Sequence, residues 1–436
     1  MDTAANNGSR PRALLTDAYR ERPYWWDRAR PPVVPELDLP RELDAVVVGG
    51  GYTGLGAAIE LADLGRSVLV LEKNELGFGA STRNGGMIHP GVNLELEQLF
   101  RKHGPLGRRI YDFTVEAFMA AEKMFEDRVA CDYDRSGHLY LAAHPSHVSS
   151  MRALEHLYRE RLGQPATFLS REDLPKEVGS QRFHGGVLIE LSGGLDPAKY
   201  HAGLAALAIR SGVAIAEDTP ALSLRAMPRG GFEVRTPRET VRARNVIVAT
   251  NGYRDGLLPW LRRRVIPIGS YIIATEPLEP ALASEVIPNR RMLFDSKNFL
   301  NYWRMSPDGR MLFGGRASFA PTTIEKARDT LYAQMVQVHP QLEGVRVERA
   351  WGGKVGFTLD RIPHAGVHEG VHFAAGYCGT GVALAHHLGR CVGAWVAGGS
   401  RPPIAEPSFP PLPAGRVTEH LLPFAGLYFQ LRDRIG

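Results

Sequence analysis

Residues 44–72 read DAVVVGGGYTGLGAAIELADLGRSVLVLE, and this stretch decides the fold. The run 45–48 is apolar and mostly β-branched, which predicts a strand buried on both faces of a parallel sheet. Glycines follow the run, and the apolar segment after them predicts a helix that ends at Gly65. The run 68–71 predicts a second buried strand. This order of elements is typical of a βαβ unit.

Three glycines in the stretch have the spacing G-x-G-x-x-G. Gly49 permits a tight turn, Gly51 lets the backbone approach a pyrophosphate, and Gly54 lets the helix pack closely on the strand. Glu72, at the end of the second strand, is placed to accept hydrogen bonds from a ribose diol. Such glycines also occur in ordinary turns before a core helix. Because strand, glycines, helix, strand and acid all appear in order, we expect a dinucleotide site.

Length and composition limit the functions open to the chain. Its 436 residues suggest two or three domains. The 52 basic and 47 acidic residues give a net charge of only +5, without a long basic run interleaved with aromatics, so we expect no nucleic-acid partner. Three scattered cysteines indicate a reducing compartment. Without a membrane-spanning run or a signal-peptide core, we expect a soluble, cytoplasmic protein.

Two further segments are rich in glycine and small residues. Residues 76–91 read LGFGASTRNGGMIHPG, which predicts an irregular loop whose backbone amides contact the pyrophosphate and the reactive ring. Residues 376–382 read GYCGTGV before a predicted helix, whose N-terminus would stabilise an electron-rich ring edge, such as the O2 side of a reduced flavin. The alternative for both segments is an ordinary surface loop.

Taken together, several motifs resemble the flavin-dependent amine and amino acid oxidases, the family of D-amino acid oxidase, glycine oxidase and monomeric sarcosine oxidase. The motifs are VVVGGGYTG, Glu72, ASTRNGG, ATNGY (249–253), WGGKVGFTLDRIP (351–363) and GYCGTGV. The resemblance extends over about residues 40–400 and is strongest to the gamma-glutamylputrescine oxidase-like branch. It implies an FAD cofactor and a substrate domain whose sheet covers the flavin.

The expected fold class is α/β, with a discontinuous Rossmann-like FAD-binding domain and a second α+β substrate domain built on a mostly antiparallel sheet. The expected segments are an N-terminal arm (1–40), the FAD-binding domain (41–100, 193–260 and 351–400), the substrate domain (101–192 and 261–350) and a C-terminal tail (401–436). The arm contains YRERPYWW (19–26), which we expect to lie against the body of the protein or at the substrate entrance. The tail is proline-rich and then amphipathic, which predicts a helix that docks on the chain or on a homodimer partner.

The motifs and the resemblance together give a set of candidate FAD contacts from six segments. These are Gly49, Gly51, Tyr52, Thr53, Gly54, Glu72, Lys73, Gly79, Ala80, Ser81, Thr82, Arg83, Asn84, Gly85, Gly86, Ala221, Thr250, Asn251, Gly252, Gly376, Tyr377, Cys378, Gly379, Thr380, Gly381 and Val382.

Two departures from the family bear on the substrate and on the cofactor linkage. In the α-amino acid oxidases an arginine in the segment corresponding to 351–360 clamps the substrate carboxylate, and Val355 holds that place here; Lys354, Arg304 or Arg316 are the alternatives. In sarcosine oxidase a cysteine of this segment attaches the flavin, and Gly353 holds that place. We therefore expect non-covalent FAD, and an α-amino acid is disfavoured as substrate unless one of these three side chains replaces the arginine.

The resemblance implies oxidation of a C–N bond in a small primary or secondary amine or amino acid derivative, followed by hydrolysis of the imine and reoxidation of the flavin by oxygen. Two readings stay open: a dehydrogenase that passes electrons to a quinone or protein acceptor, and a non-catalytic FAD-binding protein. An aromatic cage would select the neutral amine, and a lysine would assist the reaction with oxygen. The candidates are Tyr271, Tyr302, Trp303, Trp351 and Tyr377 for the cage, and Lys297 and Lys354 for the lysine.

One further pattern suggests a metal but is discounted. His364, His368 and His372 recur at every fourth position, the spacing of metal ligands on one helix face. Pro363 and Gly366 make a helix improbable there, so we expect a turn between strands and no metal site.

Overall fold

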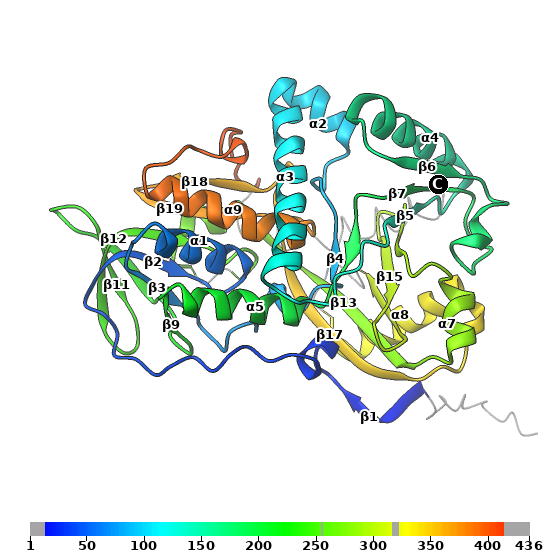
Figure 1. Ribbon diagram of the computed structural model, residues 1–436, viewed down its shortest axis with the longest axis horizontal. Helices are drawn as coiled ribbons and strands as arrows, with labels where there is room; N and C mark the ends of the chain where they lie inside the picture. Colours follow the sequence, from blue (N-terminus) through cyan, green and yellow to red (C-terminus); the bar gives the residue numbers. More distant parts are fainter. Residues whose placement is uncertain (1–13, 254–255, 316–321, 414–436) are drawn as a thin grey trace, which may run out of the picture.

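The computed structural model describes residues 14–253, 256–315 and 322–413. Two β-sheets organise these residues, and Figure 1 shows them side by side, the smaller one surrounded by helices α1, α5 and α9. The arrangement confirms the predicted α/β class with a second, mostly antiparallel sheet. The predicted C-terminal amphipathic helix and Arg316 lie outside the described residues.

The smaller sheet has the strand order β10-β11-β12-β2-β3-β9, and β19 also pairs with β12. The pairs β12–β2, β2–β3, β3–β9 and β12–β19 are parallel, as the βαβ pattern predicted. Its strands are β2 (Glu42–Val48), β3 (Val68–Leu71), β9 (Ala214–Ala216), β10 (Ser223–Ala226), β11 (Phe232–Arg235), β12 (Thr240–Val248), β18 (His364–His368) and β19 (Val371–Ala375). The helices beside it are α1 (Tyr52–Asp63), α5 (Pro197–Arg210) and α9 (Gly381–Val396).

Helices α1 and α9 cross with their backbones in contact. A Cβ added at Gly56 would overlap the carbonyl oxygen of His386, and one added at Gly389 would overlap that of Thr53. Glycine is therefore required at both crossing points, because any side chain would push the helices apart.

The larger sheet has the order β1-β17-β13-β16-β15-β14-β5-β7-β6. Its pairs are antiparallel except β1–β17 and β14–β5. The strands are β1 (Leu15–Arg20), β5 (His138–Leu141), β6 (Ala166–Leu169), β7 (Gly186–Ile189), β13 (Ile266–Pro277), β14 (Met292–Asp295), β15 (Asn301–Met305), β16 (Arg310–Gly315) and β17 (Val347–Phe357).

The two sides of the larger sheet have different neighbours. Trp303 belongs to the core between the sheet and α8 (Ile324–Val338). Ile272 and Trp351 point to the opposite side, where they pack with Trp25 of the arm. We call this second side the loop side, because the loop containing residues 79–86 lies against it.

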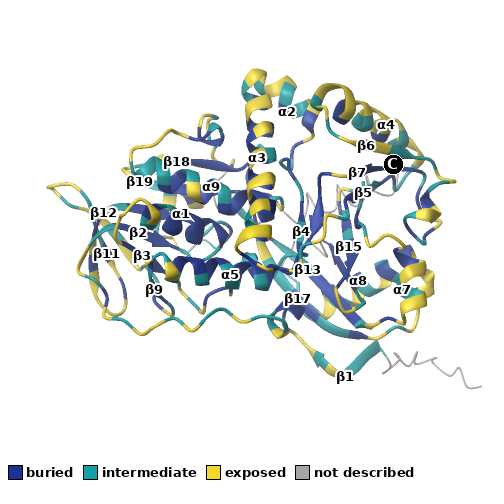
Figure 2. Cartoon of the chain, viewed as in Figure 1, coloured by how far each residue is buried: buried dark blue, intermediate teal, exposed yellow. Residues whose placement is uncertain are grey.

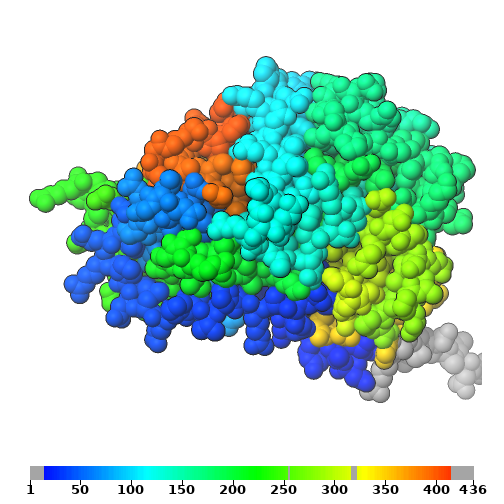
Figure 3. Space-filling model, viewed as in Figure 1, coloured from blue at the N-terminus to red at the C-terminus, as the bar shows by residue number. Residues whose placement is uncertain are grey.

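Two observations differ from the expected segment boundaries. Helix α3 (Pro105–Asp127), expected in the substrate domain, packs on α9, and its buried residues share one core with α1. Exposed residues follow its outer side in Figure 2, and it lies on the surface between the two sheets in Figure 3. Strand β17 starts before the expected boundary at residue 351, and its pairing with β13 keeps the chain in the larger sheet through Phe357.

The N-terminal arm lies against the body of the protein, as expected. Strand β1 pairs with β17, and a short 3-10 helix (Tyr24–Asp27) follows it. The side chain of Trp25 is completely buried. The chain then runs along the smaller sheet to β2, which Figure 1 shows in dark blue along the lower edge.

The histidine-rich segment is a β-hairpin rather than only a turn. His364–His368 forms β18, which pairs with β19, and Glu369 and Gly370 make the turn with positive φ angles of 49° and 78°. Within residues 14–253, 256–315 and 322–413, no group of three or more His, Cys, Asp or Glu side chains is arranged to hold a metal ion.

The remaining helices lie at the periphery. None of the helices in the described part of the chain combines the length and apolar character needed to cross a membrane. The peripheral helices are α2 (Leu96–His103), α4 (Val148–His156), α6 (Pro259–Arg262) and α7 (Pro280–Val286).

The helix crossing gives a stability prediction. Gly389→Val should lower the free energy of unfolding by about 3 kcal/mol, because the new side chain meets the backbone of α1 and not a movable side chain. Ala120→Val on the exposed face of α3 is the matched control and should change it by less than about 1 kcal/mol. Urea unfolding followed by circular dichroism measures both variants; an unchanged midpoint for Gly389→Val would contradict the close crossing.

Candidate functional site

The first glycine turn has the geometry that a pyrophosphate requires. Gly49 has a φ of 107°, and a Cβ added at Gly54 would overlap the carbonyl oxygen of Gly49. Gly51 precedes α1 and has no side chain that could cap the helix. The backbone N–H groups at the helix N-terminus therefore face the turn. Beneath the turn, the buried His201 of α5 donates from Nε2 to the carbonyl oxygen of Gly50, at 2.8 Å. The sequence analysis missed His201.

Glu72 lies at the end of β3 beside this turn. Its carboxylate accepts hydrogen bonds from the backbone N–H of Gly50 (2.8 Å) and of Asn74 (3.0 Å). Burial raises the pKa of Glu72, although these N–H groups act in the opposite direction. The carbonyl oxygen of Glu72 accepts a hydrogen bond from the backbone N–H of Thr219, so the segment that precedes Ala221 lies beside Glu72. The side chain of Lys73 is exposed. A carboxylate at this place fits a ribose diol.

The loop 79–86 is more ordered than expected, because Asn84 organises it. Ala80–Thr82 forms a 3-10 turn, and β4 (Met87–Ile88) follows the loop. The Asn84 side-chain amide donates to the carbonyl oxygens of Ala80 (3.1 Å) and Ser81 (3.0 Å) and accepts from the N–H of Gly86 (2.8 Å). The Ser81 hydroxyl accepts from the first N–H of α1, at Tyr52, so the loop and the first glycine turn are joined.

Two neighbouring tryptophans of the arm hold this loop. The indole N–H of Trp25 donates to the carbonyl oxygen of Asn84 (2.9 Å), and that of Trp26 donates to the hydroxyl oxygen of Thr82 (2.8 Å). The Arg83 guanidinium stacks on the Trp26 ring, 4.7 Å from its centre. The sequence analysis considered the arm only as packing or as a substrate entrance. The aromatic cluster YWW (24–26) was the feature of the sequence that could have indicated these contacts.

Three glycine-containing segments meet at the start of α9. The Asn251 side-chain oxygen accepts from the N–H of Gly376 (2.9 Å), and the N–H of Cys378 donates to the carbonyl oxygen of Gly356 (2.9 Å). Gly376 has a φ of 84°, and a Cβ there would overlap Thr358. Thr380 precedes α9 without capping it through its side chain. The segments 250–252 and 376–382, both among the candidate FAD contacts, are therefore adjacent.

Tyr377, a cage candidate, lies in the core and apart from the loop side of the larger sheet. Its ring is buried in the core with α1 and α9, and its hydroxyl lies 2.6 Å from the hydroxyl oxygen of Thr53. The pKa of Tyr377 is raised, chiefly by burial. The residue ties the start of α9 to the first turn of α1, which is a structural role.

The other cage candidates lie in three different environments. Tyr302 is half-buried on the loop side, with its ring beside Gly85 and its hydroxyl 3.1 Å from that of Ser270. Trp351 is on the same side but fully buried, and its indole N–H donates to the carbonyl oxygen of Arg83. Tyr271 packs with the opposite core, on the α8 side. Of the candidates, Tyr302 alone combines exposure with the loop side.

Lys297 and Arg304 bond other groups of the chain, and Lys354 is exposed. Lys297 bonds the buried Asp295 (2.7 Å) and the side chain of Asn301 (2.6 Å). Lys354 is exposed, with its ammonium 5.8 Å from the centre of the Tyr253 ring. Arg304 is buried and donates to the carbonyl oxygens of Gly86 and Leu195, so its guanidinium is not free to clamp a carboxylate.

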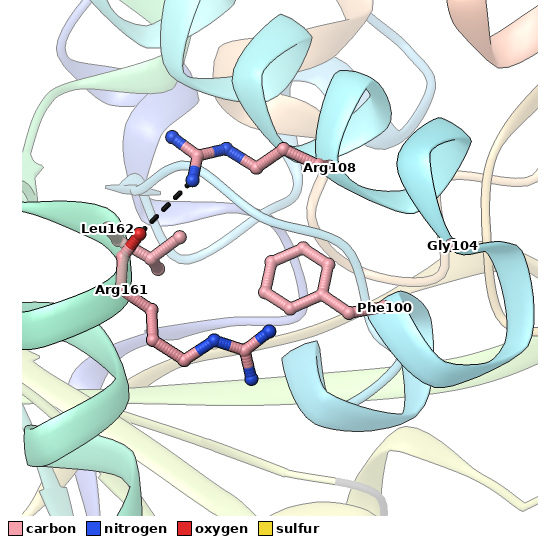
Figure 4. A pocket seen from close by; sticks show the side chains of 5 residues that line it. All are labelled: Phe100, Gly104, Arg108, Arg161 and Leu162. Carbon is pink, nitrogen blue, oxygen red and sulfur yellow. Dashed lines mark hydrogen bonds between the residues drawn. The ribbon is translucent and has the colours of Figure 1, made fainter.

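A surface pocket of about 300 Å³ lies apart from all these residues. Figure 4 shows its lining by Phe100, Gly104, Arg108, Arg161 and Leu162. Arg108 donates to the carbonyl oxygen of Arg161 (3.1 Å), and the Arg161 guanidinium lies 5.5 Å from the centre of the Phe100 ring. None of the predicted cofactor or substrate residues contributes to this pocket.

The residues near the first turn fit an FAD cofactor. The turn is free of side chains where the phosphates would lie, a helix N-terminus faces it, and Glu72 stands at the ribose position. The 79–86 loop and the start of α9 supply further backbone groups toward the sheet junction. Sequence reasoning identified these segments, but it did not identify the tryptophans and the histidine that hold them.

Comparisons with known proteins agree with this geometry. The chain is 33% identical to the probable oxidoreductase OrdL of Haemophilus influenzae, over 97% of this chain and all of that protein. It is 30% identical to the gamma-glutamylputrescine oxidoreductase of Escherichia coli, over 90% and 93% of the two chains. The crystal structure of glycine oxidase from Geobacillus kaustophilus has the same fold, with a TM-score of 0.69 at 22% identity, covering 83% and 96% of the chains.

The model of the DAO family, described as FAD dependent oxidoreductase, matches residues 44–395. This match includes every glycine-rich segment described above and most strands of both sheets. The chain therefore belongs to the DAO family and is an FAD-dependent oxidoreductase.

Proposed function

We propose that this protein oxidises the C–N bond of a primary or secondary amine to an imine, and that oxygen reoxidises the reduced cofactor. The observation that carries the proposal is the position of Tyr302. It is a half-exposed aromatic residue on a central strand of the larger sheet, and its ring touches Gly85 of the predicted flavin loop. The 30% identity to a protein named gamma-glutamylputrescine oxidoreductase supports an amine as substrate.

FAD, when bound, accepts a hydride equivalent from the carbon that carries the amine nitrogen. The chain's own residues position the reactants: Tyr302 offers an apolar ring to the substrate, and Ser270 fixes that ring through its hydroxyl. The amine loses two electrons and two protons, and water then converts the imine to a carbonyl compound and an amine or ammonia. Oxygen takes up the two electrons and two protons and leaves as hydrogen peroxide.

The cysteines support non-covalent FAD. Cys378 is buried, with its sulfur close to Thr358 and 3.1 Å from the carbonyl oxygen of Gly376. Cys131 is buried and Cys391 lies in α9. The scattering of the three cysteines along the chain also supports a cytoplasmic location.

We further propose that the substrate lacks an α-carboxylate. Val355, at the place of the family's clamping arginine, packs with Ile268, Phe357 and Cys378. Arg304 already donates to two backbone carbonyl oxygens. A carboxylate held here by neither residue would lose its hydration without a charged partner.

A panel of amines tests the proposed reaction. The panel contains a polyamine, an N-methyl amine, a γ-glutamyl amine and an amino acid, each added without oxygen. At least one amine should bleach the flavin absorbance, and α-amino acids should bleach it to the smallest extent. Admission of oxygen should then restore the colour and release one peroxide per flavin. Bleaching without peroxide would favour the dehydrogenase reading, and a flavin that stays oxidised against every amine would contradict amine oxidation.

Glu72→Gln tests the ribose contact. Because a charge-assisted hydrogen bond contributes about 1.5–3 kcal/mol, the dissociation constant of FAD should rise about 10- to 150-fold. The exposed neighbour Glu75→Gln should change it less than about twofold. Fluorescence titration of the apoproteins with FAD gives both constants, and equal affinities would remove Glu72 from the site.

Tyr302 is tested by a pair of substitutions. Tyr302→Ala should lower kcat/KM for the best amine about 10- to 100-fold, because the substrate loses its positioning surface. Tyr302→Phe keeps the ring and should stay within about fivefold. Stopped-flow reduction of the flavin separates this effect from the reaction with oxygen, and equal losses in both variants would assign the role to the hydroxyl and not to the ring.

A further inference from the structure

Three aromatic side chains form a row across central strands of the larger sheet. Phe294 of β14 is in register with Tyr302 of β15 on one side and with Tyr140 of β5 on the other. Residues in register on neighbouring strands point to the same side of a sheet. The three rings, which we call the aromatic row, therefore all lie on the loop side.

The aromatic row remains accessible although its strands are central. Tyr140, Phe294 and Tyr302 are each half-buried. Their sequence neighbours on the α8 side, Leu139 and Leu293, are completely buried. The three rings are therefore less completely covered on the loop side than their neighbours are on the α8 side.

Both ends of the aromatic row are closed. At one end the ring of Tyr302 lies over Gly314 and against Gly85, the loop predicted to contact the flavin. At the other end the register continues from Tyr140 to Val187 of β7, which is completely buried where α4 packs on β6 and β7. Two strand spacings separate Tyr302 from Tyr140, so the row is about 10 Å long.

Two neutral histidine side chains lie beside the aromatic row. The ring centre of His138 lies 5.5 Å from those of His89 and Phe294, and His89 meets Phe294 edge-on at 6.0 Å. The Nδ1 of His89 lies 2.7 Å from the carbonyl oxygen of Pro90, which can only accept, so Nδ1 carries the proton. Burial lowers the pKa of both imidazoles, that of His138 to about 3, so both are neutral at pH 7.

We propose that the aromatic row binds the hydrocarbon chain of an extended alkylamine and sets the preferred chain length. The amine-bearing carbon lies at the Tyr302 end, beside Gly85, and the chain runs over Phe294 toward Tyr140. This inference rests on the proposed amine oxidation and specifies its substrate class. The row suits a hydrocarbon, because its rings and the neutral imidazoles offer apolar surface and no ion pair.

The test uses the FAD-loaded enzyme under anaerobic conditions, titrated with ethylamine, propylamine, butylamine and hexylamine. The change in the flavin spectrum on mixing gives the dissociation constant, and the later bleaching gives the reduction rate. Each added methylene should lower the dissociation constant about fourfold until the row is filled. In Phe294→Ala this gain should fall below about twofold per methylene, because the chain loses the central ring of the row.

Phe168→Ala is the matched control. Phe168 is in register with Val187 but lies beyond it on β6, at the edge of the sheet. This variant should keep the fourfold gain per methylene. Phe294→Leu, which keeps apolar volume, should recover part of the gain, and its flavin content and thermal midpoint show that the fold is intact.

The outcomes separate this inference from the proposed function. Equal chain-length dependence in Phe294→Ala and the unmodified enzyme, or affinity that does not rise with chain length in the latter, would overturn the role of the aromatic row. Either result leaves amine oxidation standing if another amine of the panel bleaches the flavin. If no amine bleaches it, the proposed reaction itself fails.

Discussion

The contact of α1 with α9 is the constraint on which the site depends. Glycines at the crossing points, Gly56 and Gly389, let the two backbones touch, so no side chain sets the distance between the helices. The hydroxyl groups of Thr53 and Tyr377 then join the two N-termini directly. Two partial positive charges are thereby brought to one edge of the smaller sheet. An anionic diphosphate and an electron-rich ring both benefit from that arrangement.

The second constraint is the attachment of the 79–86 loop. Its carbonyl oxygens accept from Trp25 of the arm and, at Arg83, from Trp351 of β17, while Asn84 closes the loop internally. The loop belongs to the smaller sheet in sequence but is held by the larger one. Hydrogen bonds across the sheet junction therefore fix the position of the 79–86 loop relative to the larger sheet.

Much of the fold could be predicted from sequence, because local patterns determine it. Strand β3 (Val68–Leu71) has the predicted bounds, and the predicted strand 45–48 lies within β2 (Glu42–Val48). Side-chain direction could not be predicted in the same way. Tyr271 packs on the α8 side because of its position in β13, and Tyr302 and Phe294 become neighbours only through the pairing of β14 with β15. The pairing of β14 with β5, far apart in sequence, then adds Tyr140 to the site.

A buried charge under the loop gives a physical reason for selecting a neutral amine. Arg304 donates to the carbonyl oxygen of Gly86, and burial followed by the charge of Arg290 lowers its pKa to about 10, so it stays cationic at pH 7. A second cation close to Gly86 would be repelled in this weakly screened environment. An ammonium ion is disfavoured there relative to the free amine, whose lone pair is required for hydride loss.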